Sequence, residues 1–361
     1  MKKRSADEGV PESDCIEGAP HPRHNHLLFG HGAAEQELLE AYRAGRLQQA
    51  WIIGGEEGVG KATLAWRFAR FLFANPRHDS PAVAMARDLS VSPDHPAAHR
   101  VDSLSLGDLS LLRREWNDKT KKHFTEIRMD DVRHALEMFH HAAGEGGWRI
   151  CIVDCAEDLN RSGANALLKV MEEPPPRSLF LIVSHRPARI LPTIRSRARM
   201  LQLHPLSEEE VTQAVTALGE PWSDMGAEVA GAAKRAGGSV RQALRFLDKD
   251  RMELGESVED LLARLPQIDW QGVHRLADRI AGTAAVDEFD SVVTALFDWL
   301  DARVRSGAAA GEGVGRLAPY AEVWEKVADA VREAEALNLD KRPLVLSIFA
   351  DLASAVRAAR S

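Results

Sequence analysis

Short apolar runs alternate with amphipathic segments between residues 26 and 205. Runs with the length and content of buried strands lie at residues 50–54, 149–154, 179–184 and 200–203. Between them, apolar side chains recur every three or four positions over residues 61–74 and 163–173, which predicts helices. Pro174 must end the second of these helices, because proline lacks the amide that a helix interior needs. Strands that alternate with helices predict a parallel sheet with helices on both faces.

After residue 205 the pattern is helical. Residues 207–210, Ser-Glu-Glu-Glu, have the form of a capping box, and the glycine pair at 237–238 predicts a helix end before a further helix at 240–247. Helical periodicity continues at 273–280, 289–304, 323–336 and 344–358, with a flexible small-residue loop at 307–315. We therefore expect four parts: a flexible polar tail (1–25), an α/β P-loop domain (26–205), a small helical lid domain (206–265) and a C-terminal all-α bundle (266–361).

Composition limits the class of protein. The chain has 361 residues, of which 45% are hydrophobic and 28% charged, and this balance is typical of a globular protein. No apolar run reaches the roughly 20 residues that span a bilayer. The 3 cysteines are too few for a disulfide scaffold and fit a reducing compartment. We expect a cytoplasmic protein that does not associate with a membrane.

The charge is unevenly distributed. Residues 1–200 carry 28 Lys and Arg against 27 Asp and Glu, whereas residues 201–361 carry 18 against 27. A protein that grips DNA alone normally shows a basic stripe, and phosphate would repel this acidic second half. Any contact with nucleic acid is therefore expected to be shared with partner proteins.

A glycine-rich loop separates the first strand from the first helix. Its sequence, GEEGVGK at residues 55–61, supplies Gly55, Gly58, Gly60 and Lys61. In this strand–loop–helix setting the backbone amides converge on a phosphate and the lysine reaches its outer oxygens. A turn that binds nothing is the alternative. The next position, normally a Mg²⁺-binding Ser or Thr, is Ala62. The hydroxyl comes at Thr63, which we expect to face elsewhere because one helical residue turns the chain by about 100°.

The second strand ends in another candidate group. Asp154 stands where an acidic residue holds the water shell of the metal in P-loop enzymes. Active ATPases of this type carry Glu directly after it, but this chain has Cys155, and we expect Glu157 to point away. We interpret Cys151 and Cys155 as reduced, buried thiols. Binding of ATP and Mg²⁺ is expected to be weak or absent, with little or no ATP hydrolysis.

The order of these motifs resembles the AAA+ clamp-loader subunits of bacterial DNA polymerase III, most closely the delta-prime group. The most specific stretch is NALLKVMEEPP at residues 165–175, followed by LPTIRSRA at 191–198. The family patterns are NALLKxLEEPP and Ser-Arg-Cys, and Ala198 replaces the cysteine. The resemblance runs from about residue 28 to the C-terminus. It implies an AAA+ P-loop domain, a helical lid and a C-terminal helical collar.

The resemblance also implies roles for single residues. Arg197 corresponds to an arginine finger that acts on the ATP of a neighbouring subunit, whereas the other arginines between 186 and 199 are expected to form a solvated basic segment. Ser184 corresponds to the first sensor. Arg241 corresponds to the second sensor, although a structural arginine at a helix end is an equal alternative. Residues 73–100 lack the four-cysteine zinc module of many relatives, so we expect no zinc and no other bound metal; the stretch 81–112 stays unassigned.

The partners implied are the delta and gamma/tau subunits, with the sliding clamp and primed DNA reached through the assembled loader in DNA replication. This subunit would belong to the DNA polymerase III holoenzyme without hydrolysing ATP itself. The alternatives are a gamma/tau-like P-loop ATPase, disfavoured by Ala62 and Cys155, and a DNA-binding regulator, disfavoured by the acidic second half. Trp299, Trp324 and Phe349 are candidates for the assembly interface, although we expect at least two of them to fill the core of the bundle.

Overall fold

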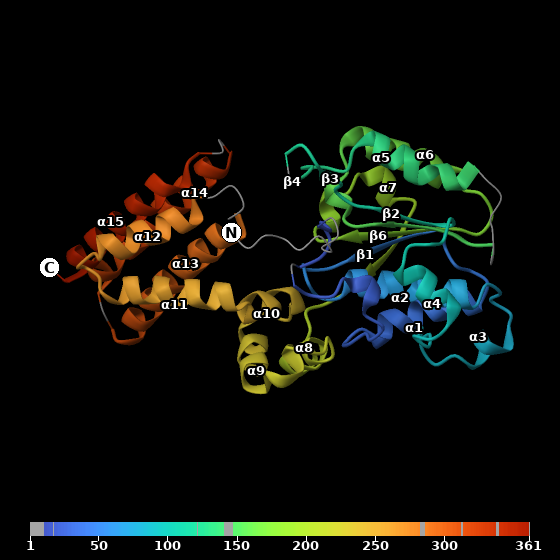
Figure 1. The fold of residues 1–361 in the computed structure, drawn as a ribbon, viewed down its shortest axis with the longest axis horizontal. Coiled ribbons are helices and arrows are strands. Elements are labelled where there is room, and N and C mark those ends of the chain that lie inside the picture. Colours follow the sequence, from blue (N-terminus) through green and yellow to red (C-terminus); the bar gives the residue numbers. More distant parts are fainter. Residues whose placement is uncertain are drawn as a thin grey trace. The chain divides into compact units, whose positions relative to one another are not determined.

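The computed structural model describes residues 11–16, 18–120, 122–140, 147–281, 286–311, 313–336 and 339–360. The chain divides into two compact units, Met1–Leu244 and Arg245–Ser361. Figure 1 labels their helices and strands. Within the described part of the chain, no helix is both long and apolar enough to cross a membrane.

The first unit is built on a parallel five-stranded sheet with the strand order β2-β5-β6-β1-β7. Its strands are β1 (Ala50–Gly54), β2 (Leu109–Leu112), β5 (Arg149–Val153), β6 (Ser178–Ser184) and β7 (Arg199–Gln202). Every residue of β1, β5 and β6 is buried, as expected where helices cover both faces of a parallel sheet. The four predicted strands are confirmed, and β2 is an edge strand that the sequence pattern did not reveal.

Helices cover both faces of this sheet (Figure 1). One face packs against α1 (Gly32–Arg43), α2 (Lys61–Ala74) and α4 (Pro96–Asp102), and the other against α5 (Met129–Leu136), α6 (Arg161–Glu172) and α7 (Pro192–Arg195). Successive side chains of a strand point to opposite faces. Trp51 and Ile53 accordingly join the core with α1 and α2, whereas Ile52 joins the core with α5 and α6. The predicted α/β fold class is confirmed.

The unassigned stretch 81–112 completes this unit. It forms α3 (Pro81–Met85), α4 and β2, and it buries Val83, Leu89, Val101 and Leu106. A short antiparallel pair follows, β3 (Trp116–Asn117) with β4 (Lys122–His123). The stretch therefore extends the sheet and its apolar core.

The described residues of the expected flexible tail (1–25) make ion pairs with one another and with the rest of the first unit. Asp14 pairs with the buried His21 at 2.9 Å and with Arg113 at 2.7 Å. Arg113 also binds Glu12, at 2.9 Å. These residues read as a solvated tail because their partner lies far along the chain, where no local pattern could reveal it. Residues 1–10 and 17 lie outside the described residues.

The first unit ends with α8 (Glu208–Thr216), α9 (Gly226–Arg235) and the beginning of α10 (Val240–Leu247), which continues past the unit boundary at Leu244. The predicted capping box is confirmed. The Ser207 hydroxyl accepts from the Glu210 amide, and the Glu210 carboxylate accepts from the Ser207 amide.

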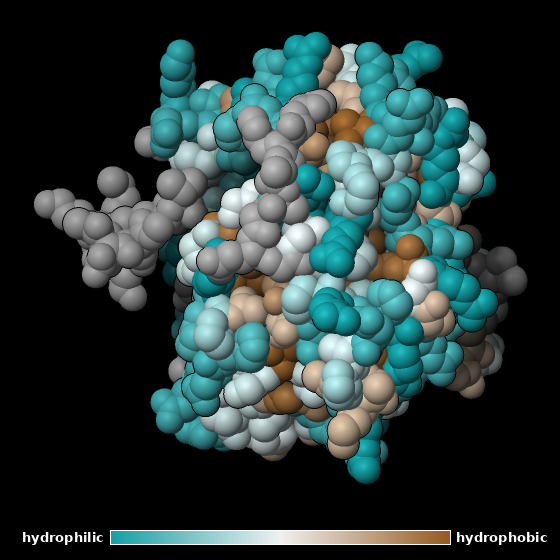
Figure 2. Space-filling model, turned by 90° about the vertical axis from the view of Figure 1, so that its right-hand side faces the viewer, coloured by the Kyte–Doolittle hydropathy of each residue, from teal (hydrophilic) through white to brown (hydrophobic). Residues whose placement is uncertain are grey.

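On the face shown in Figure 2, hydrophobic side chains lie in small separate groups among hydrophilic ones.

The second unit consists of α11 (Lys249–Ala263), α12 (Trp270–Ile280), α13 (Val286–Ala309), α14 (Val314–Ala336) and α15 (Lys341–Arg360). The expected lid range 206–265 is divided between the two units, because Leu254, Val258 and Leu261 of α11 are buried in the core of this bundle. The loop expected at residues 307–315 is shorter, since α13 continues to Ala309 and α14 begins at Val314.

Candidate functional site

The glycine-rich loop has the backbone that its sequence predicts. Gly55, Gly58 and Gly60 have φ angles of 148°, 82° and 104°, values that favour glycine. A Cβ atom at Gly55 would lie 2.7 Å from the Leu203 carbonyl oxygen, so the loop passes close to the backbone that follows β7. Gly60 is the N-cap of α2. The loop therefore presents the N-terminus of α2, where backbone amides and the helix dipole favour an anion.

Lys61 is almost fully buried at the start of α2, with 3% of its surface exposed. Its ammonium group donates to the Glu56 carbonyl oxygen. Burial lowers the pKa of Lys61 to about 8, and the nearby Asp154 carboxylate opposes this shift. His31, which was not predicted as a site residue, contacts the same loop. Its Nε2 lies 2.6 Å from the Val59 carbonyl oxygen. The ammonium group of Lys61 is thus already bound within the loop.

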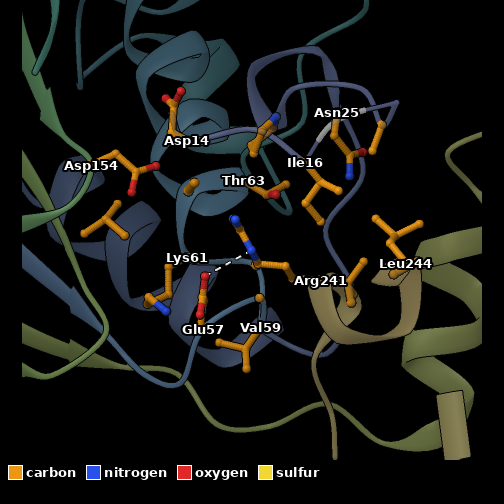
Figure 3. Close-up of a pocket in the computed structure, with 18 of the residues that line it drawn as sticks. Asp14, Ile16, Asn25, Glu57, Val59, Lys61, Thr63, Asp154, Arg241 and Leu244 are labelled. Carbon is orange, nitrogen blue, oxygen red and sulfur yellow. Dashed lines mark ion pairs between the residues drawn. The ribbon is translucent and has the colours of Figure 1, made fainter. Parts of the chain in front are cut away.

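A cavity of about 320 Å³ lies beside the loop and is shown in Figure 3. Its wall includes Lys61, Thr63 and Asp154, together with Asp14 and Asn25 from the N-terminal segment. Thr63, which was expected to face elsewhere, lines this cavity as well. The structure thus brings together most of the predicted phosphate-binding residues.

Asp154 and Cys155 follow β5 and line this cavity. Burial raises the pKa of Asp154 to about 7, which the nearby Asp14 reinforces and Lys61 opposes. Burial also raises the pKa of the Cys155 thiol, and both Cys155 and Cys151 are buried and free, as predicted. A neutral thiol cannot serve as a general base. With Ala62 at the usual hydroxyl position, the cavity lacks one of the usual ligands of a catalytic Mg²⁺ ion.

Ser184 is the last residue of β6, but it does not line the cavity, and its hydroxyl is bound to Glu157. It donates to Oε1 of Glu157 at 2.5 Å, and the same oxygen accepts from the Arg186 amide. Ser184 is fully buried. The next residue, His185, does line the cavity, and burial lowers its pKa. His185 was missed, although its place directly after a strand that leads to the site was a usable signal.

Arg241 lines the cavity from the first turn of α10. Its Nε lies 3.0 Å from Oε1 of Glu57 in an ion pair, which Figure 3 marks with a dashed line. A cation at a helix N-terminus is opposed by the helix dipole, so the local helix does not explain this arginine. Its ion-pair partner, Glu57, lies in the glycine-rich loop, and its side chain lines the cavity.

Arg197 does not line this cavity. It follows α7, its side chain is 40% exposed, and it forms an ion pair of 2.8 Å with Glu172 at the end of α6. Arg199 is paired with Glu37 at 2.6 Å. The Arg195 side chain makes no ion pair or hydrogen bond with any described residue. The exposed guanidinium of Arg197 is therefore paired outside the cavity that lies beside the glycine-rich loop.

Comparison with known proteins finds relatives for the part of the chain that contains this site. Residues 30–207 match the family described as "DNA polymerase III, delta subunit". The chain is 29% identical over 238 residues to the DNA polymerase III subunit delta' of Escherichia coli, which covers 65% of each chain. It is 33% identical over 170 residues to the subunit delta' of Pseudomonas aeruginosa, covering 45% of each.

A gamma/tau subunit is also similar. The DNA polymerase III subunit gamma/tau of Mycobacterium tuberculosis is 31% identical over 161 residues, which cover 44% of this chain and 25% of that one. The matches thus span about two thirds or less of these relatives. They confirm the resemblance that the motifs predicted.

Proposed function

We propose that this chain, whose residues 30–207 match the family described as "DNA polymerase III, delta subunit", is a delta-prime subunit of a clamp loader. In this role it hydrolyses little or no ATP and supplies an arginine finger to the ATP of a neighbouring subunit. The observation that carries the proposal is the position of Arg197, exposed and outside its own cavity. A finger acts in trans, so its guanidinium must reach beyond its own chain.

The chemistry of the cavity supports the non-hydrolysing role. Phosphoryl transfer needs a metal to neutralise the developing charge and a group to orient the attacking water. Ala62 lacks the hydroxyl that would hold the metal, and the buried thiol of Cys155 stands where a carboxylate would act. Lys61 and the loop amides are present, but the hydroxyl that would hold the metal is missing, so we infer that nucleotide binding is weak or absent. Because the arginine finger would act on the ATP of a neighbouring subunit, its role does not require this chain to hydrolyse ATP in its own cavity.

The proposed partners are the delta and gamma/tau subunits, with which this chain would load a sliding clamp on primed DNA during replication in the cytoplasm. The C-terminal bundle is the proposed assembly surface. Trp324 is 46% exposed on α14, whereas Phe349 lies in the core of the bundle and Trp299 packs against it. Of these three candidates, Trp324 is therefore the aromatic side chain best placed to meet a partner.

Arg197→Ala in a reconstituted loader tests the proposal. An arginine finger contributes about 10³–10⁵ in rate at its own site. Because the other ATP sites keep theirs, total ATP hydrolysis should fall partially and clamp loading further. Assembly should be unchanged, since an exposed ion pair such as that of Arg197 contributes at most about 1 kcal/mol.

Arg195→Ala is the matched control. It removes the same charge two residues away, and unlike Arg199 its side chain has no partner among the described residues. Equal losses in the two variants would assign the effect to general electrostatics. Unchanged ATP hydrolysis and clamp loading in Arg197→Ala would reduce this subunit to a scaffold.

A further inference from the structure

The N-terminus of α10 is joined directly to the phosphate-binding loop. The Ser239 hydroxyl donates to the Glu57 carbonyl oxygen at 2.8 Å, and the Val240 amide donates to the Gly58 carbonyl oxygen at 2.9 Å. The ion pair between Glu57 and Arg241 adds a third link (Figure 3). We call these three contacts the α10 latch.

The two surfaces of the latch are in close contact. A Cβ atom at Gly58 would lie 2.2 Å from the Ser239 hydroxyl oxygen, 2.5 Å from Cβ of Arg241 and 2.9 Å from the Arg241 backbone nitrogen. Only glycine leaves room for α10 at this distance. The N-terminus of α10 therefore packs directly against the backbone of Gly58.

The cationic side chains of the cavity are all engaged by the chain. Besides the pairing of Arg241 with Glu57, Arg114 is paired with Asp158 at 3.0 Å, and the Lys61 ammonium group is bound by the Glu56 carbonyl. A bound triphosphate would need such cations as partners for its terminal phosphate. To recruit Arg241, it would first have to displace a carboxylate that is already in contact.

We propose that Glu57 is an internal competitor of a nucleotide's terminal phosphate: its carboxylate holds Arg241 and keeps α10 latched to the loop. This inference rests on the proposed weak nucleotide binding, for which it supplies one cause within the cavity. Glu57 is then a specificity-determining residue, because it acts against a triphosphate more than against a diphosphate. It acts through Arg241 rather than on the ligand.

The test compares Glu57→Gln with Glu56→Gln in the full chain, titrated with fluorescent analogues of ATP and ADP. Both substitutions remove one negative charge from the same loop, but the Glu56 side chain is exposed, does not line the cavity and has no partner among the described residues. A charge-assisted contact freed for phosphate predicts about a tenfold gain in ATP affinity for Glu57→Gln. ADP affinity should change less than about threefold, and Glu56→Gln should match the unmodified chain for both.

Hydrogen exchange at the Val240 amide gives a second readout that needs no ligand. Exchange should be faster in Glu57→Gln and unchanged in Glu56→Gln. Equal ATP affinities in the two variants, equal gains for ATP and ADP, or no gain at all would overturn the proposal, as would unchanged exchange in Glu57→Gln.

Co-purification of the unmodified chain with delta and gamma/tau subunits separates this inference from the proposed function. Failure of the unmodified chain to assemble would refute the proposed clamp-loader role. Normal assembly combined with indistinguishable Glu57 and Glu56 variants would refute the competition alone.

Discussion

Replacing Gly58 with alanine should detach α10 from the phosphate-binding loop. The new methyl group would clash with Ser239 and with the backbone of Arg241. Gly58 also has a φ angle of 82°, which costs a side-chain-bearing residue roughly 1–2 kcal/mol. Relief of the clash requires α10 to move, and this breaks the two hydrogen bonds and the ion pair of the latch.

The size of the effect follows from these three contacts. Each hydrogen bond contributes about 1 kcal/mol and the half-exposed ion pair at most about 1 kcal/mol. A loss of about 2–3 kcal/mol raises the opening equilibrium of α10 roughly 30- to 160-fold. The Val240 amide reports this opening, because its partner is the Gly58 carbonyl oxygen and it lies at the first position of the helix. Its hydrogen-exchange rate should increase by that factor.

Gly237→Ala is the matched control for backbone strain. Gly237 also has a positive φ angle, 57°, but a Cβ atom there would meet nothing within 4 Å. The Val211 amide of α8, bonded to the Ser207 carbonyl oxygen, is an internal reference that should not change in either variant. Equal acceleration at Val240 in the two variants would refute the steric reasoning, because strain alone would then account for the effect.

Two further predictions concern the pH dependence of stability and the bundle. The folded pKa of Asp154, about 7, exceeds its ordinary value of 3.8, so the folded protein holds an extra proton between these values and loses stability as the pH rises through that window. Asp154→Asn should remove this decline in a comparison of melting temperatures at pH 4.5 and pH 8; an unchanged decline would contradict the assignment. Phe349→Ala should cost about 3–5 kcal/mol in urea unfolding, because Phe349 is fully buried in the bundle. Trp324→Ala should cost less than about 1 kcal/mol yet weaken co-assembly with the partner subunits, and normal assembly of this variant would exclude Trp324 from the interface.

Local signals in the sequence were sufficient for the fold class and for the backbone conformation of the glycine-rich loop. The strand at residues 50–54, the helix after Lys61 and the capping box at Ser207 were all predicted correctly. Each depends on neighbours within a few residues: apolar periodicity, glycines that permit positive φ angles, and a side chain that bonds an amide three positions away. Such features can be predicted from the sequence because the residues that determine them are close together along the chain.

Several errors arose where distant segments meet. The edge strand β2 has little pattern of its own and is fixed by its pairing with β5. Leu254, Val258 and Leu261 of α11 are buried in the core of the bundle, so the expected lid range 206–265 is divided between the two units. Thr63 was judged from helix rotation alone, but it lines a cavity whose wall also includes the distant residues Asp14 and Asn25.

The sequence by itself determined which chemical groups this protein has and which it lacks: the glycines and lysine of the loop, an alanine in place of a metal-binding hydroxyl, and a cysteine in place of a water-orienting carboxylate. Only the tertiary structure decided how the charges are paired. Arg113 binds Asp14 across 99 positions of sequence, and Ser239 meets Glu57 across 182. The strength of an ion pair or hydrogen bond depends on distance in space, and that distance is set by the packing of the whole unit. The pairing of Arg241 with Glu57 therefore could not be deduced from the motif that contains Glu57.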